Sequence, residues 1–141
     1  MQRIMIVSDT HRRHGNLAEA IYNEGHLDML IHLGDVEGEE EVIKSIAGCE
    51  TIFIAGNNDF FSPLDREKEI ELGGKKIWLT HGHNYYVSLD LKVIEQEAVA
   101  RGMDIVMFGH THRPVIIVED NITPVSYTHL RAHETDQYIV C

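Results

Sequence analysis

The chain lacks the features that mark membrane proteins, disulfide-rich proteins and nucleic-acid-binding surfaces. Its two cysteines, Cys49 and Cys141, give neither a disulfide framework nor a CxxC zinc pair. The apolar run that ends at Val7 is too short for a signal peptide or a transmembrane span, so we expect a cytoplasmic protein without a membrane partner. Lys and Arg number 12 against 23 Asp and Glu, and the net charge of −11 disfavours nucleic acid as a surface-bound partner.

The composition is otherwise that of one ordinary globular domain. A chain of 141 residues can bury a core without disulfides or a structural metal, and 43% hydrophobic with 25% charged residues argues against disorder. Histidine is the unusual residue type, because ten histidines are many for this length. Their number directs attention to chemistry that uses imidazole.

Short apolar runs alternate with helical patterns along the chain. Strands are predicted at 3–7, 27–33, 51–55, 68–72, 75–80, 104–108 and 114–119, and helices at 16–24, 39–47 and 88–101. Asn16 is the expected cap of the first helix, and the third helix is expected to be the longest. This alternation predicts an α/β domain with a mostly parallel sheet, to which Gly73-Gly74 adds an antiparallel hairpin.

Five polar clusters each follow a predicted strand. They are Asp9-Thr10-His11, Gly34-Asp35, Gly56-Asn57-Asn58-Asp59, Thr80-His81-Gly82-His83 and Gly109-His110-Thr111-His112. Sites in α/β sheets form beyond the carboxyl ends of the strands, so loops far apart in sequence can converge there. Each cluster alone has a plainer interpretation, such as a capping Asp beside a surface His, or a Gly-Asp turn. All five in this order are a strong joint signal.

The side chains that these clusters would gather are oxygen and imidazole donors without thiolate. They are Asp9, His11, Asp35, Asn57, His81, His110 and His112. Such a set favours Mn, Fe, Co, Ni or Zn over Ca or Mg, with Mn as the first expectation. Seven ligands are too many for one tetrahedral zinc, and they suit two adjacent ions that share one carboxylate.

The ordered motifs D-x-H, GD, GN-x-D, H-G-H and G-H-T-H resemble those of the calcineurin-like metallophosphoesterases, and the short length resembles their small bacterial and archaeal phosphodiesterase branch. The resemblance extends from residue 1 to about residue 122. It implies two packed β-sheets with mostly parallel core strands, flanked by helices, and a two-metal centre at the strand ends. It further implies that Asp9, His11 and His112 hold the first ion, that Asp35 bridges both, and that Asn57, His81 and His110 hold the second.

The resemblance also implies a reaction. Two ions about 3.5–4 Å apart can bind and deprotonate a bridging water, and the resulting hydroxide would attack the phosphorus of a small phosphodiester in line. Many relatives carry histidine where this chain has Asn58. General-acid assistance is worth about 10²–10⁴-fold, so its absence favours substrates with good leaving groups. Asn58 and Asp59 are expected on the leaving-group side, with Asp59 orienting the loop.

Two further residues are candidate substrate contacts. Arg113 follows the last ligand, although an exposed arginine is its plainer interpretation, and His83 lies two residues beyond His81. His14, His26 and His32 have no motif support and are expected to be structural or exposed.

A non-catalytic scaffold or interaction module of the same fold is the alternative function. The small retromer subunit of eukaryotes resembles this fold, works chiefly as a scaffold and also lacks histidine at the position of Asn58. All seven ligand positions are filled here, which favours catalysis because a scaffold is free to lose ligands. A third possibility is a single bound ion, with the remaining histidines packed. The natural substrate, the metal used in the cell and the oligomeric state cannot be read from the sequence.

The C-terminal residues have a different character. Residues 125–135 read Val-Ser-Tyr-Thr-His-Leu-Arg-Ala-His-Glu-Thr, which resembles one reading frame of a sequencing adapter. We therefore predict a metallophosphoesterase domain at 1–124 that lacks its C-terminal strands, followed by a non-native tail at 125–141. An ordinary polar C-terminal segment is the alternative. On the first interpretation, His129 and His133 belong to no site.

Overall fold

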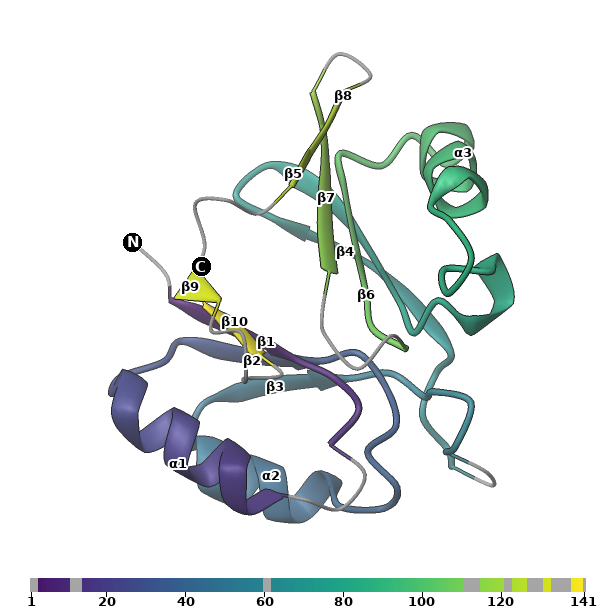
Figure 1. The fold of residues 1–141 in the computed structure, drawn as a ribbon. Coiled ribbons are helices and arrows are strands. Elements are labelled where there is room, and N and C mark those ends of the chain that lie inside the picture. The colour runs from purple at the N-terminus through teal and green to yellow at the C-terminus, as the bar shows by residue number, and fades with distance from the viewer. Residues whose placement is uncertain are drawn as a thin grey trace.

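The chain folds into two facing β-sheets with helices on their outer sides (Figure 1). A computed structural model describes residues 3–10, 14–59, 62–110, 115–120, 123–126, 131–132 and 138–140. The predicted fold class, two packed mixed sheets flanked by helices, is confirmed. Among the described residues, no helix has the length and apolar character needed to cross a bilayer.

The first sheet carries the N-terminal half of the chain. Its strand order is β3-β2-β1-β10-β9. Strands β1 (Ile4–Val7), β2 (Met29–His32) and β3 (Glu50–Phe53) are parallel, whereas β10 (Tyr138–Val140) runs antiparallel to β1 and β9 (Arg131–Ala132) antiparallel to β10. Helices α1 (His14–Glu24) and α2 (Glu40–Ala47) cover the face turned away from the second sheet (Figure 1).

The second sheet has the order β4-β5-β6-β7-β8 and is more antiparallel than predicted. Strands β4 (Glu67–Leu72) and β5 (Lys75–Thr80) form the expected hairpin, and β5 pairs in parallel with β6 (Ile105–Phe108). Strands β7 (Val115–Asp120) and β8 (Thr123–Ser126) continue the sheet in antiparallel pairs. The short 3-10 helix η1 (His83–Tyr85) and helix α3 (Lys92–Ala100) lie on its outer side.

Alternation along each strand divides the core into layers. In β1, Met5 and Val7 pack with the apolar sides of α1 and α2, whereas Ile6 packs between the two sheets. Both faces of β1 are covered, which explains its uninterrupted apolar sequence. A third apolar layer, with Trp78 and Ile94 at its centre, lies between the second sheet and α3.

Two helix starts differ from the prediction. Helix α1 begins at His14, so Asn16 lies inside the helix rather than at its cap. Helix α3 begins at Lys92, and at 9 residues it is shorter than α1 with 11. The reason is a preceding turn, in which the Tyr86 carbonyl accepts the N–H groups of Leu89 and Asp90. The Asp90 carboxylate then accepts the N–H of Lys92 and marks the true start.

The C-terminal region contributes strands to both sheets. Strand β8 crosses the predicted boundary between residues 124 and 125, and β10 pairs with β1 in the first sheet. The division into a domain at 1–124 and a non-native tail stays a prediction.

Candidate metal centre

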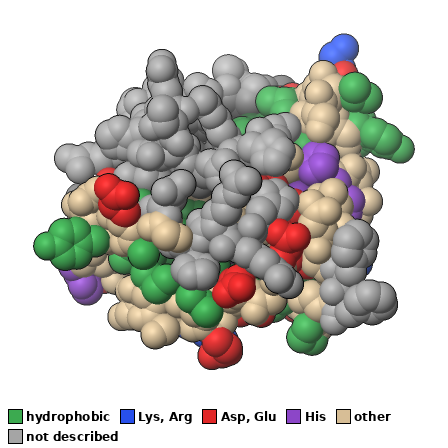
Figure 2. All heavy atoms as spheres, turned by 60° about the horizontal axis from the view of Figure 1, so that its bottom comes forward, with side chains coloured by type: hydrophobic (Ala, Val, Ile, Leu, Met, Phe, Trp, Pro, Cys, Tyr) green, Lys and Arg blue, Asp and Glu red, His purple; other side chains and the backbone are tan. Residues whose placement is uncertain are grey.

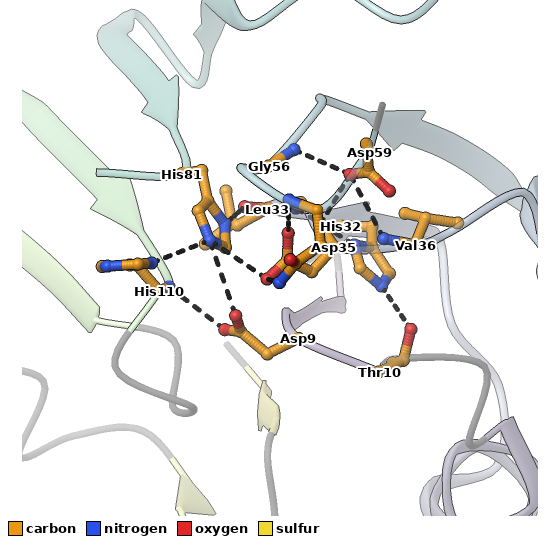
Figure 3. Close-up of polar contacts among 12 residues, drawn as sticks. Asp9, Thr10, His32, Leu33, Asp35, Val36, Gly56, Asp59, His81 and His110 are labelled. Atoms are coloured by element: carbon orange, nitrogen blue, oxygen red, sulfur yellow. Dashed lines mark hydrogen bonds and ion pairs between the residues drawn. The ribbon is translucent and has the colours of Figure 1, made fainter. Parts of the chain in front are cut away.

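The polar clusters meet where the two sheets face each other. Asp9 and Asp35 follow β1 and β2 of the first sheet, and His81 and His110 follow the parallel strands β5 and β6 of the second. Figure 3 shows their side chains pointing toward one another from opposite sheets. The convergence expected for loops beyond the carboxyl ends of strands is therefore present for these four predicted ligands.

Three of these side chains form a buried cluster. Asp9 and Asp35 are each 2% exposed and His81 is 0% exposed. One ligand atom from each residue lies within 4.8 Å of the other two. His81 Nε2 is 3.6 Å from Asp9 Oδ1 and 3.4 Å from Asp35 Oδ2. Two carboxylates and an imidazole at this spacing can together bind a divalent ion.

A backbone carbonyl orients the imidazole of His81. Its Nδ1–H donates to the carbonyl of Leu33 at 2.7 Å, so the lone pair belongs to Nε2, the nitrogen that faces both carboxylates. Histidines that bind metals commonly donate their other ring N–H in this way. His110 completes the group, with its Nδ1 at 3.3 Å from His81 Nε2 and its backbone N–H donating to Asp9 Oδ2 at 3.1 Å.

The Gly56–Asp59 loop supports Asp35. The backbone N–H of Asn58 donates to Asp35 Oδ1 at 2.9 Å, and its side-chain amide donates to Oδ2 at 3.1 Å. Asp59 is buried beneath the loop. Its Oδ2 accepts the N–H groups of Asp35 and Gly56, both at 2.7 Å, and that of Val36 at 3.3 Å, while Oδ1 accepts that of Glu37 at 2.6 Å. The carboxylate of Asp59 therefore ties the loop after β3 to the loop after β2.

Two motif glycines are required by close approach. A Cβ at Gly56 would collide with the Asp35 carboxylate. A Cβ at Gly34 would lie 2.6 Å from His81 Nδ1, and the φ of Gly34, +109°, lies in a region that other residues rarely adopt. Glycine at these positions lets the Asp35 loop pass close to His81 and the Asn57 loop pass close to Asp35.

Three of the predicted ligands have a left-handed backbone. The φ angles of Asp9, Asp35 and His110 are 56°, 62° and 70°. This conformation costs a non-glycine residue roughly 1–2 kcal/mol, and such strain concentrates at functional sites. Each strained residue has its N–H bonded to another cluster: Asp9 to the carbonyl of Gly34, Asp35 to Asp59, and His110 to Asp9.

The surroundings of the two carboxylates shift their pKa values in opposite directions. Burial raises the pKa of Asp9 above its ordinary value. Burial acts in the same direction on Asp35, but the contact with His81 and the N–H groups of Asn58 outweigh it, so the pKa of Asp35 is lowered. Burial also works to lower the pKa of His81, but its contacts with Asp35 and Asp9 raise it. Strongly perturbed titratable groups that face one another are typical of functional sites.

The donor set fits divalent metal ions. Asp9 Oδ1 and Asn57 Oδ1 are buried and have no hydrogen-bond partner within the part of the chain that the structure describes. Carboxylate, amide oxygen and imidazole nitrogen are the donors that Mn²⁺, Fe²⁺ and Zn²⁺ accept together. In Figure 2, histidine side chains reach the surface at the right and at the lower left of the face shown, and acidic side chains are spread over that face.

Of the remaining predicted site residues, the structure describes only some. The half-buried ring of His83 is centred 5.6 Å from that of His81 and 6.0 Å from that of His110. His11, His112 and Arg113 lie outside the described residues. The first predicted ligand set is therefore represented by Asp9 and Asp35, and the second by Asp35, Asn57, His81 and His110.

Comparisons with known proteins agree with this geometry. The profile of the "Calcineurin-like phosphoesterase superfamily domain" matches residues 2–139. A probable metallophosphoesterase of Methanocaldococcus jannaschii, MJ0623, is 32% identical over 117 residues, which are 80% of this chain and 60% of that protein. The chain thus spans less than two thirds of that relative.

Solved structures show the same fold. An archaeal protein characterised as a phosphodiesterase superposes with a TM-score of 0.62 at 26% identity, over 99% of this chain and 98% of that one. Vps29 of Entamoeba histolytica, solved with Zn²⁺, superposes with a TM-score of 0.68 at 21% identity, over 88% and 72% of the two chains. From its converging motifs, its two facing sheets and the profile that spans nearly all of it, the chain belongs to the calcineurin-like phosphoesterase superfamily.

Proposed function

We propose that this chain is a metal-dependent phosphodiesterase that holds two divalent ions at the centre and hydrolyses a small phosphodiester. The observation that carries the proposal is the buried cluster of Asp9, Asp35 and His81, with ligand atoms within 4.8 Å of one another in a chain of the phosphoesterase superfamily. The archaeal relative characterised as a phosphodiesterase supports a diester as the substrate.

The donors divide naturally around Asp35. A ligand atom of Asp35 lies within 4.8 Å of one from His81 and of one from Asp9, which we assign to different ions, so its carboxylate is placed to serve both. His81, His110 and Asn57 would hold one ion with it. Asp9 would hold the other, together with His11 and His112, which lie outside the described residues.

When bound, the two ions supply Lewis-acid chemistry, activating water and neutralising charge on the phosphoryl oxygens. The protein's own contribution is to hold the ligands in place. Leu33 fixes the ring of His81, and Asn58 fixes both oxygens of Asp35. An asparagine cannot deliver a proton to a leaving group at neutral pH, so we propose that the substrate has a good leaving group. His83 and Arg113 are proposed to contact the substrate.

The direct test is Mn²⁺-dependent hydrolysis of an activated aryl diester, bis(4-nitrophenyl) phosphate, by chain whose folding has been checked by circular dichroism. Asp35→Asn should lower the rate at least about a hundredfold, and a chelator should abolish turnover, because both remove the charge stabilisation that the centre provides. Asp65→Asn makes the same chemical change at an exposed carboxylate and should retain full activity. Metal analysis should give about two Mn²⁺ per chain, whereas one would favour a single-ion protein.

A scaffold is the second candidate. The likeness in fold to Vps29 favours it. A folded chain that binds two ions but turns over no phosphodiester would replace the enzyme proposal with this one.

A further inference from the structure

A fully buried histidine outside the motifs lies between the loops that carry the two carboxylates. His32 is the last residue of β2, is 0% exposed and precedes Asp35 by three positions. Figure 3 shows its ring beside the Asp35 loop, with a contact to Thr10 in the loop that follows β1. No motif includes His32, and sequence reasoning assigns it only a structural or exposed role.

The contacts of His32 indicate which ring nitrogen carries the proton when the ring is neutral. The backbone N–H of Gly34 donates to Nδ1 at 3.2 Å, so Nδ1 must carry a lone pair. The proton of the neutral ring is then on Nε2, which lies 3.0 Å from Thr10 Oγ1 and donates to it. The His32 ring thus accepts a hydrogen bond from the Asp35 loop and donates one to the Asp9 loop.

The ring has little freedom to turn away from these partners. It is stacked on Phe53 of the adjacent strand β3, with centroids 5.9 Å apart and planes at 27°. The same two loops are joined through their backbones, because the N–H of Asp9 donates to the carbonyl of Gly34 at 2.9 Å. The two loops are therefore joined by side-chain and backbone hydrogen bonds that lie within a few residues of one another.

We propose that His32 is a positioning residue of the metal centre, which fixes the Asp9 loop and the Asp35 loop relative to each other through its two ring nitrogens. The proposal rests on the proposed metal-dependent function. The hydrogen-bond partners of His32 are Thr10 and Gly34, the immediate neighbours of Asp9 and Asp35. The φ angles of Asp9 and Asp35, 56° and 62°, are left-handed and need support from the surrounding structure.

The two contacts of the ring have separable consequences. The contact with Thr10 acts beside Asp9, which serves one ion, whereas the contact with Gly34 acts beside Asp35, which serves both. Loss of the Thr10 contact should therefore weaken one Mn²⁺ site, and loss of the Gly34 contact should weaken both. Residues that orient metal ligands typically contribute 10- to 100-fold in metal affinity.

A pair of amide substitutions separates the two contacts. In His32→Asn, the amide oxygen can occupy the place of Nδ1 and accept the Gly34 N–H, but Thr10 is out of reach. In His32→Gln, the amide nitrogen can occupy the place of Nε2 and donate to Thr10, but the Gly34 N–H loses its acceptor. Both variants lose the stacking on Phe53 alike. Thr10→Val replaces the hydroxyl with a methyl group of similar size, and His26→Asn makes the same substitution as His32→Asn at an exposed histidine.

The measurement is Mn²⁺ titration of metal-free chain by calorimetry, with urea unfolding of each variant in a chelator. Thr10→Val and His32→Asn should each weaken one of the two sites by about 10- to 100-fold, His32→Gln should weaken both, and His26→Asn should match the wild type. Long-range proton–nitrogen NMR of the metal-free wild type should show His32 protonated at Nε2.

Three results would overturn the inference. The first is wild-type Mn²⁺ affinity in variants that lose only stability, which would make His32 a core residue and no more. The second is an identical effect of the Asn and Gln substitutions, and the third is a proton on Nδ1. A wild-type chain that binds no Mn²⁺ would refute the proposed function itself, and this inference with it, so the two failures are told apart by the wild type alone.

Discussion

Replacement of Asp59 by asparagine should destabilise the chain and weaken metal binding together. The Asp59 carboxylate is 4% exposed and accepts four backbone N–H groups, three at Oδ2 and one at Oδ1. An asparagine has one acceptor oxygen. If that oxygen serves the three donors at Oδ2, the amide NH₂ must face the N–H of Glu37, and the reverse orientation leaves three donors unpaired.

The expected loss in the free energy of unfolding follows from these contacts. Hydrogen bonds to a charged acceptor contribute about 1.5–3 kcal/mol each, and an unpaired buried donor costs about 1–3 kcal/mol. Loss of one bond and weakening of the other three should total about 3 kcal/mol. For a chain of this size that corresponds to a fall of about 10 °C in Tm. The weakened bonds include the one that holds the backbone N–H of Asp35 in its left-handed conformation, so Mn²⁺ affinity should fall by at least about tenfold.

Urea unfolding in a chelator measures the first effect without stabilisation by bound metal, and calorimetric titration with Mn²⁺ measures the second. Asp65→Asn, an exposed carboxylate in the same connection between β3 and β4, is the matched control and should change neither. An Asp59→Asn chain that unfolds at the wild-type urea concentration would refute the reasoning, as would one that unfolds earlier but binds Mn²⁺ with wild-type affinity.

Three further predictions concern other parts of the molecule. Gly56→Ala should abolish tight Mn²⁺ binding in a calorimetric titration, because its Cβ would collide with the Asp35 carboxylate. Gly15→Ala, in open space within α1, should keep wild-type Mn²⁺ affinity and raise the free energy of unfolding in urea by up to about 0.5–1 kcal/mol. Equal Mn²⁺ affinities in the two variants would contradict the steric argument. Burial works to lower the pKa of His81, but Asp35 and Asp9 raise it, so bound protons compete with metal; Mn²⁺ affinity should rise with pH through the raised His81 pKa, and a constant affinity between about pH 6 and about pH 9 would count against it. Burial and the hydrogen bonds to Glu67 raise the pKa of Tyr85 to about 12, so ultraviolet titration should show one late-ionising tyrosine that disappears in Tyr85→Phe.

Elements defined by local pattern could be predicted from the sequence. The apolar run at 104–108 becomes β6 (Ile105–Phe108), and Gly73-Gly74 joins the β4–β5 hairpin as expected. The ends of these runs place the polar clusters, because a chain leaving a buried strand needs polar residues at once. Four predicted ligands, Asp9, Asp35, His81 and His110, could be found together from these endings alone.

Features that depend on partners distant in sequence could not be predicted. The late start of α3 follows from the turn at Tyr86 and from the Asp90 carboxylate, and periodicity does not register either. His32 carries no motif, because its role depends on Thr10, 22 residues earlier. The left-handed backbone of Asp9, Asp35 and His110 could not be predicted from residue type either, since aspartate and histidine occur far more often in other conformations.

Those three strained residues explain why the clusters occur as a set. Asp9 is held by the carbonyl of Gly34, Asp35 by Asp59, and His110 by Asp9, so each ligand is stabilised by a residue of another cluster. A strain of roughly 1–2 kcal/mol at each ligand persists only if its partner remains. A relative that keeps every metal ligand but loses Asp59 should therefore relax at Asp35 and bind metal poorly. Ligand completeness alone is thus a weaker sign of a working centre than ligands accompanied by the residues that hold their backbone.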